Sequence, residues 1–413
     1  MQACASSPRP ALIGIVANEP SGDQLGALLI QALRALRPEL RFVGVAGPKM
    51  LAQGCETLLP MERLSVMGLV EVAKVLPELL RARRELVARL RQLQPLVVIG
   101  VDAPDFNLGL ERRLRARALP TVHLVSPTVW AWRPGRVKQI RRAVDLMLSI
   151  FPFEAEFLRA HRVPVEYIGH PLADEIPFDP DRKAARLALG LQPESPAADG
   201  EPDAQRTAAP ETALVAILPG SRRSELELLG PPLLETAAWC HARRPGLRFI
   251  APMVSEVLRE RFEALRRALA PGVPLRLLNG QSREAMAAAD VVLTASGTAT
   301  LEALLSKRPM VVAYRLHPLT YWLVTRLRLI KVRYAAMANL LVGRELAPEF
   351  LQERCRAECM GPALLALLDD AERLAEIEQA YRQVHLQLKR HAAHRAAEAI
   401  LALIDRTGGT SCG

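Results

Sequence analysis

Four residues in the second half of the sequence, Ser296, Gly297, Thr298 and Glu302, have the types and spacing of a nucleotide-binding turn. They follow an apolar run at 291–294, and a helical pattern begins near Thr298. A strand that turns directly into a helix presents free N–H groups and a positive dipole end, which together bind phosphate. Gly297 permits close approach to the backbone, and Glu302 can accept hydrogen bonds from ribose hydroxyls. The alternative is a well-capped turn without a ligand.

Two more polar residues of this half lie near the ends of predicted strands. Arg222 follows the apolar run 214–218 through a Gly-Ser turn, and a guanidinium there can bind a diphosphate through two parallel hydrogen bonds. Asn339 begins a polar stretch, 339–345, which we expect to be a loop beyond the strand at 310–314.

Asp102 is the candidate general base. It follows the continuous apolar run 95–101, which is typical of a central parallel strand. Ligands of open α/β sheets bind at the carboxyl ends of strands, and a carboxylate placed there can remove a proton. The alternative is a helix cap for residues 108–117, a role that suits Asp105 better than Asp102.

Glu19 and Ser21 lie in the turn after the first apolar run, 11–17, and before a helical pattern at 25–36. This is another strand–glycine turn–helix unit, so both residues are candidates for the lining of a substrate site. An N-terminal helix cap with acidic first-turn residues explains the same pattern equally well.

Trp130 and Trp132 lie in a predicted loop after the strand at 121–126, where a lid or a sugar-stacking surface is plausible. His170 precedes a proline at the end of the strand 165–172. It is a candidate ligand or catalytic group, although a lone histidine is more often structural.

Strands and helices alternate along the whole chain, which predicts an α/β fold with two similar halves. The composition changes to Pro, Asp, Glu, Ala and Gly after residue 176, which indicates a domain boundary near 173–185. Residues 192–212 have the composition of a flexible surface insertion. The sequence therefore predicts a first domain at 1–175 and a second at 176–384.

The 413 residues carry a formal net charge of +10, so we expect an anionic partner. Only 4% of the residues are aromatic and no aromatic platforms lie between basic residues, which argues against nucleic acid. The six cysteines lack metal-binding spacing and fit a reducing compartment. No signal-peptide core and no apolar run near 18 residues is present, so we expect a protein in the cytoplasm or held to its side of a membrane.

Residues 64–80 are densely apolar, and five arginines follow between 81 and 91. Such an arrangement can lie in a membrane interface, where the arginines meet lipid phosphates. Periodicity alone favours a buried helix followed by an amphipathic one.

Taken together, the motifs resemble those of the lipid-A-disaccharide synthase family from about residue 11 to about residue 400. They keep the order and rough spacing of that family: ANEPSGD at 17–23, VGVAGP at 43–48, MGLVE at 67–71, DAPDFN at 102–107, SPTVWAWR at 126–133, IGHP at 168–171, LPGSR at 218–222, ASGTATLE at 295–302 and NLLVGRE at 339–345. Asn18 stands where the family usually has Gly, and residues 192–212 are longer than usual.

The resemblance implies a GT-B glycosyltransferase: two Rossmann-like domains facing across a cleft, with a C-terminal helix at about 385–405 packing back on the first. It implies that UDP-2,3-diacylglucosamine and 2,3-diacylglucosamine 1-phosphate (lipid X) are joined into a β-1,6-linked disaccharide 1-phosphate, with release of UDP. The resemblance also implies peripheral attachment to the anionic inner membrane. For residues 64–80 it therefore favours contact with acyl chains or the membrane over a buried helix. A monomer and a homodimer both stay open.

The mechanism that the resemblance implies is an inverting displacement without metal or other cofactor. Asp102 is the base, Arg222 and the amides around Ser296–Thr298 hold the leaving UDP, and Glu302 binds the ribose. Glu19, Ser21 and Asn339 line the cleft. Two alternatives remain: another GT-B enzyme of UDP-sugars, such as a 2-epimerase, and a non-catalytic protein that binds a phosphorylated ligand.

Overall fold

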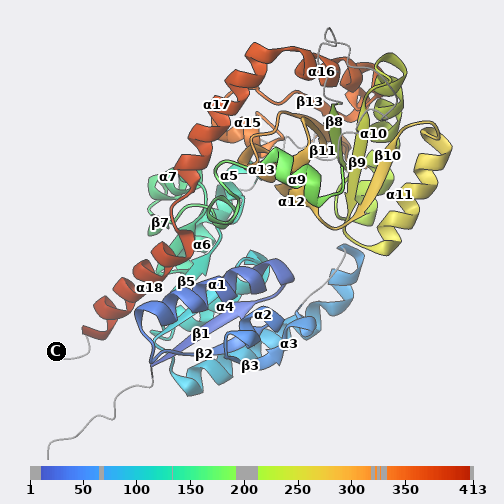
Figure 1. The fold of residues 1–413 in the computed structure, drawn as a ribbon. Helices are drawn as coiled ribbons and strands as arrows, with labels where there is room; N and C mark the ends of the chain where they lie inside the picture. The colour runs from blue at the N-terminus through green and yellow to red at the C-terminus, as the bar shows by residue number, and fades with distance from the viewer. Residues whose placement is uncertain are drawn as a thin grey trace, which may run out of the picture. The chain divides into compact units, whose positions relative to one another are not determined.

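The computed structural model describes residues 11–64, 69–132, 134–191, 213–317, 321–322, 326 and 333–409, while the side chains of 69–75, 131–134 and 408–409 are not described. The chain divides into two compact units (Figure 1). Unit 1 comprises residues 1–174 and 388–413, and unit 2 comprises residues 175–387. The predicted insertion at 192–212 lies outside the described residues.

Unit 1 is built on a seven-stranded parallel sheet with the order β3-β2-β1-β4-β5-β6-β7. The chain order of the strands reverses between β1 and β4, which is where open α/β sheets bind ligands. The strands are β1 Leu12–Ala17, β2 Arg41–Ala46, β3 Cys55–Pro60, β4 Val97–Val101, β5 Thr121–Leu124, β6 Leu146–Ser149 and β7 Val165–Tyr167. The helices are α1 Pro20–Leu36, α2 Pro48–Ala52, α3 Leu69–Leu93, α4 Pro104–Arg115, α5 Val129–Trp132, α6 Val137–Ala143, α7 Pro152–Ala160, α8 Pro171–Glu175 and α18 Ala392–Gly409.

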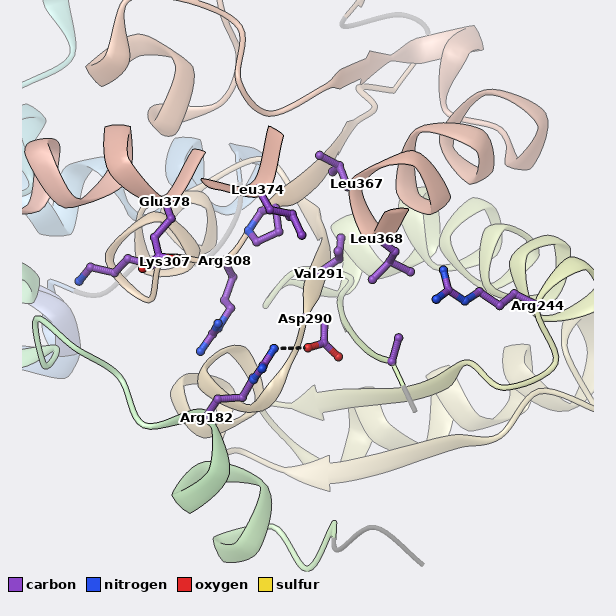
Figure 2. Close-up of a pocket in the computed structure, with 12 residues that line it drawn as sticks. Arg182, Arg244, Asp290, Val291, Lys307, Arg308, Leu367, Leu368, Leu374 and Glu378 are labelled. Atoms are coloured by element: carbon purple, nitrogen blue, oxygen red, sulfur yellow. Dashed lines mark hydrogen bonds and ion pairs between the residues drawn. The ribbon is translucent and has the colours of Figure 1, made fainter. Parts of the chain in front are cut away.

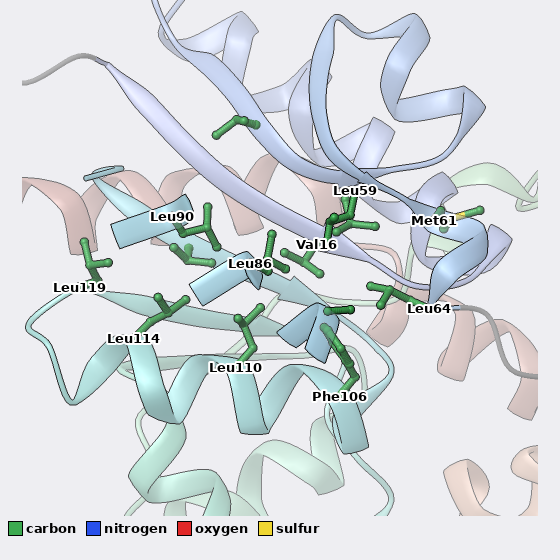
Figure 3. Close-up of a cluster of buried hydrophobic side chains, with 14 of the residues drawn as sticks. Val16, Leu59, Met61, Leu64, Leu86, Leu90, Phe106, Leu110, Leu114 and Leu119 are labelled. Carbon is green, nitrogen blue, oxygen red and sulfur yellow. The ribbon is translucent and has the colours of Figure 1, made fainter. Parts of the chain in front are cut away.

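Helices α3 and α4 cover one face of this sheet and close its core (Figure 3). Leu86 and Leu90 of α3 are fully buried against Leu110 and Leu114 of α4, because both helices place apolar residues at helical spacing on one side. The second half of α3 is thus a core helix, whereas Leu76 in its first half is exposed. The earlier apolar side chains of the predicted membrane stretch lie largely outside the described residues.

The C-terminal segment completes unit 1. Figure 1 shows α18 beside α1, and Arg37 at the end of α1 forms an ion pair of 2.6 Å with Asp405. The carboxylate of Asp174 accepts hydrogen bonds from the N–H groups of His391 and Ala392, which cap the start of α18.

Unit 2 repeats the design with a six-stranded parallel sheet of order β10-β9-β8-β11-β12-β13. Its order reverses between β8 and β11. The strands are β8 Leu214–Leu218, β9 Arg248–Met253, β10 Leu275–Asn279, β11 Val291–Ala295, β12 Met310–Tyr314 and β13 Glu349–Leu351. The helices are α9 Arg182–Ala188, α10 Arg223–Arg243, α11 Glu256–Leu269, α12 Ser282–Ala288, α13 Thr298–Leu305, α15 Met337–Val342, α16 Ala357–Asp369 and α17 Ala371–Leu388.

The α/β class with two Rossmann-like sheets is confirmed. Two strands were not predicted, the edge strands β3 and β13. The predicted loop at 339–345 is wrong in its first half, since Asn339 lies within helix α15. In the part of the chain that the structure covers, no helix combines the length and apolar character needed to cross a bilayer.

Candidate donor and catalytic sites

The predicted nucleotide residues of unit 2 meet in one pocket of about 330 Å³. Thr294 of β11 pairs with Leu218 of β8, so the turns that follow these two strands are neighbours at the carboxyl edge of the sheet. The lining includes all five residues predicted for the donor: Arg222, Ser296, Gly297, Thr298 and Glu302. Residues far apart in the sequence are thus brought together as expected for one ligand.

The turn before α13 presents backbone N–H groups to this pocket. Gly297 precedes the first helical residue, Thr298, and both are exposed. The φ of Gly297 is +153°, a conformation that L side chains rarely adopt, while a Cβ there would meet open space. The glycine is therefore required for its backbone angle. The Ser296 hydroxyl donates to the carbonyl of Ala335 at 2.8 Å, which fixes the turn from the other side.

The turn before α10 leaves the guanidinium of Arg222 exposed to solvent. Glu225 accepts hydrogen bonds from the N–H groups of Ser221 and Arg222, at 3.0 and 3.3 Å, so its carboxylate occupies the anion position that these two N–H groups form. Gly220 is required for its φ of +106°, and a Cβ there would also lie 2.7 Å from the Cβ of Glu225. The Arg222 side chain stays 80% exposed at the pocket and can reach a diphosphate.

Glu302 lies deeper in the same pocket. Its side chain is 18% exposed, and Oε1 lies 3.7 Å from Nε of Arg283. Burial raises the pKa of this carboxyl, and the Arg283 charge opposes that shift. Half-buried beside a single arginine, Glu302 retains oxygen atoms for the hydroxyls of a bound sugar or ribose.

In unit 1, Asp102 and Glu19 follow the two strands between which the sheet order reverses. Ala17 of β1 pairs with Val101 of β4, so the residues that follow them are neighbours. Asp102 is half-buried, while Glu19 and Ser21 are exposed on the first turn of α1. The three predicted residues therefore share the edge where a parallel sheet binds ligands.

The backbone at Asp102 is strained. Asp102 and Ala103 have φ angles of +50° and +43°, which few non-glycine residues adopt, at about 1–3 kcal/mol each. The amide of Asn107 holds this turn, donating to the carbonyls of Asp102 at 2.8 Å and Val101 at 3.2 Å. Strain of this kind is concentrated at functional sites, and Asn107 is a supporting residue that the sequence did not single out.

Two neighbouring carboxylates have structural roles. Asp23 is buried and accepts hydrogen bonds from the N–H groups of Gly47, Lys49 and Met50, which ties α1 to the start of α2. Asp105 is exposed and pairs with Arg136 at 2.5 Å. Neither is the side chain that caps α4, which begins at Pro104, earlier than predicted.

Asn339 does not line an opening, which corrects its predicted place in a cleft. Its side chain is fully buried. The amide nitrogen donates to Ala347 and Glu349, and the oxygen accepts from the N–H groups of Leu346 and Ala347. Every hydrogen-bonding group of the side chain is used within the protein, so Asn339 holds the segment before β13.

Trp130 and Trp132 lie on the short helix α5 rather than in the predicted loop, and His170 has the structural role that the sequence favoured for a lone histidine. Trp130 is half-buried and donates its indole N–H to the buried carboxyl of Glu154 at 3.1 Å. The side chain of Trp132 lies outside the described residues. His170 is buried, which lowers its pKa to about 4, and its backbone N–H donates to the carbonyl of Leu388. It joins β7 to the returning C-terminal segment.

Within the described ranges, no group of three or more His, Cys, Asp or Glu is placed to hold a metal ion. The Arg222 guanidinium and the N-terminus of α13 can stabilise a negatively charged ligand in the unit 2 pocket that holds the predicted nucleotide residues.

Comparison with known proteins gives one family. Residues 13–404 match the model of a family described as lipid-A-disaccharide synthetase. A curated lipid-A-disaccharide synthase of Sodalis glossinidius is 48% identical, over 97% of this chain and 100% of that protein.

Solved structures share the two-sheet fold at low identity. The UDP-GlcNAc 2-epimerase of Neisseria meningitidis, solved bound to UDP-GlcNAc, has a TM-score of 0.60 at 11% identity, over 95% of this chain and 99% of that one. The calicheamicin glycosyltransferase CalG4 has a TM-score of 0.57 at 14% identity, over 96% and 98%. At this identity the likeness concerns the fold alone.

Proposed function

Because the chain belongs to the lipid-A-disaccharide synthase family and is a glycosyltransferase of the GT-B fold, we propose how its two units divide the reaction. The enzyme joins UDP-2,3-diacylglucosamine to lipid X and releases UDP. Unit 2 is the donor domain, and unit 1 is the acceptor and lipid domain. The proposal rests on one observation: Arg222, the 296–298 turn and Glu302 line the same pocket of unit 2, the donor pocket.

The UDP moiety binds in the unit 2 pocket. Its diphosphate accepts hydrogen bonds from Arg222 and from the first N–H groups of α13, and the ribose hydroxyls donate to Glu302. The two backbone turns are fixed before the reaction begins: Gly297 sets the turn before α13, and Glu225 holds the backbone before α10. Donors that need no rearrangement stabilise developing charge more than mobile ones do.

Asp102 is the general base. The 6-hydroxyl oxygen of lipid X attacks the anomeric carbon of the donor while Asp102 takes its proton. The bond from that carbon to the diphosphate oxygen breaks, and its electron pair leaves with UDP, where Arg222 and α13 meet the charge. One displacement inverts the anomeric centre and gives the β-linkage. Glu19 and Ser21, exposed beside Asp102, contact the acceptor sugar. The proposal requires no metal or other cofactor.

Acyl chains and the inner membrane are assigned to the first half of α3. Leu76 is exposed there, and Arg81 and Arg84 follow on the same helix. An exposed leucine followed by arginines suits a boundary between lipid tails and phosphates. We therefore expect a cytoplasmic protein bound peripherally to the inner membrane. The homodimer left open by the sequence is tested by sedimentation in detergent.

The decisive experiment measures UDP release from UDP-2,3-diacylglucosamine in detergent, with and without lipid X and with EDTA. Release that requires lipid X and ignores EDTA supports both the transfer and its metal-free course. UDP binding without release, or turnover of the donor that ignores lipid X, would refute the transferase assignment and favour the binding-protein or 2-epimerase alternative.

A further inference from the structure

A second polar pocket lies in unit 2 at the opposite edge of its sheet (Figure 2). It has a volume of about 280 Å³. Ala213, Val291 and Pro309 line it at the amino-terminal ends of β8, β11 and β12, whereas the donor pocket lies at the carboxyl ends. The two pockets share no lining residue.

Positive charge exceeds negative charge in this second pocket. Its lining holds four cationic side chains, Arg182, Arg244, Lys307 and Arg308, but only two carboxylates, Asp290 and Glu378.

Both carboxylates already have partners. Asp290 accepts from Arg182 through one oxygen, and from Arg186 and the N–H of Leu214 through the other. Glu378 accepts from Arg382 at 3.0 Å. Arg244 in turn is paired with Asp369. No carboxylate of the pocket is therefore left to neutralise a further cation.

Arg308 has no anionic hydrogen-bond partner among the residues that the structure describes. It donates through one terminal nitrogen to the carbonyl of Ala287, and its buried Nε–H has no acceptor among the described residues. It forms no ion pair within that same set. Burial, and next the charge of Arg182, lower the pKa of Arg308, so its surroundings disfavour the charge that an arginine must keep. Figure 2 shows its side chain extending toward Arg182 and Asp290.

We propose that this pocket binds a small anion of the phosphate class, held by Arg308 together with Arg182. Such an anion supplies the acceptor that the buried Nε–H lacks and neutralises the excess of positive charge. Leu367, Leu368 and Leu374 form an apolar wall beside it, which leaves room for an apolar group on the same ligand. The site is separate from the donor pocket, so this inference does not depend on the proposed reaction.

Calorimetric titration of the full chain with inorganic phosphate, and then pyrophosphate, tests the site at constant ionic strength set with chloride. Because the donor pocket can also hold phosphate, the titrations use the Arg222→Gln background. We expect binding to persist there and to weaken at least about tenfold when Arg308→Gln is added. Arg267→Gln is the matched control, since Arg267 is an exposed unit 2 arginine outside both pockets.

A second variant keeps the test decisive if Arg308→Gln does not fold. Leu374→Asp places a carboxylate in the pocket wall without removing any hydrogen bond of Arg308, and we expect it to abolish phosphate binding by repulsion. Undiminished binding in both variants, or no binding in the Arg222→Gln background, would overturn the proposal.

Discussion

Trp130 and Glu154 are joined by a hydrogen bond of 3.1 Å from the indole N–H to the carboxyl. The Ser149 hydroxyl donates to the other oxygen of the same carboxyl, also at 3.1 Å. Trp130 belongs to the segment after β5, and β5 is the neighbour of β4, the strand that Asp102 follows. A buried acid on α7 therefore fixes a segment beside the proposed base.

This relationship predicts a pH-dependent stability. Burial raises the pKa of Glu154 to about 8, against ~4.3 for an unfolded glutamate. Between these values the folded chain holds a proton that the unfolded chain has lost. The free energy of unfolding therefore falls as the pH rises, by about 2 kcal/mol between about pH 6.5 and 8, and levels off above.

Urea denaturation at several pH values checks this, with Glu154→Gln expected to lose that part of the slope. The window avoids His170, whose lowered pKa acts with the opposite sign below about pH 6.5. Equal slopes in the wild type and the variant would contradict the assignment.

Asp102→Asn should lower kcat by about 100-fold or more, because the amide cannot take the proton of the acceptor hydroxyl. UDP binding, measured by calorimetry, should be unchanged, since the donor pocket lies in unit 2. Asp105→Asn is the control: Asp105 is an exposed carboxylate paired with Arg136, and its loss should change kcat little. Turnover near that of the wild type in Asp102→Asn would remove Asp102 from the mechanism.

Gly297→Ala should destabilise the chain by about 1 kcal/mol and weaken UDP binding. The added methyl group meets open space, so the cost comes from the φ of +153° rather than from a clash. Gly246→Ala is matched to it, because a Cβ there also meets open space while its φ lies outside the left-handed region. Similar losses in both variants would show that the backbone angle is not the cause.

Arg222→Ala should lower kcat/KM for the UDP-sugar by about 100-fold, as expected when a charged donor to the leaving group is removed. The adjacent Arg223 pairs with Glu227 and does not line the pocket, so Arg223→Ala is expected to act within about twofold of the wild type. Steady-state kinetics of the two variants, measured side by side, decide the point. A loss shared equally by both would indicate a general charge effect.

The strands on either side of the point where each sheet reverses its strand order could be predicted, because they are continuous apolar runs. The polar residues that follow these strands then indicated where the donor and acceptor sites lie. Strand β3 could not, since its exposed Glu56 and Thr57 break the apolar run at the sheet edge. The prediction for Asn339 was wrong because a polar residue beyond a strand suggests the lining of a ligand cleft. Its burial depends instead on the segment before β13, which packs over it. The sequence did not indicate the buried Glu154, because a buried carboxyl on a helix resembles an exposed one in sequence.

Unit 1 is discontinuous in sequence, so its last helix is synthesised only after the whole of unit 2. Its sheet is complete by residue 174, but the helix that packs beside α1 begins only at Ala392. During translation, unit 2 leaves the ribosome as one continuous segment and can fold while unit 1 still lacks α18. The apolar surface that Ile400 and Ile404 later cover is exposed to water for that interval. Nascent unit 1 is therefore the part of the chain with the longest need of chaperone protection.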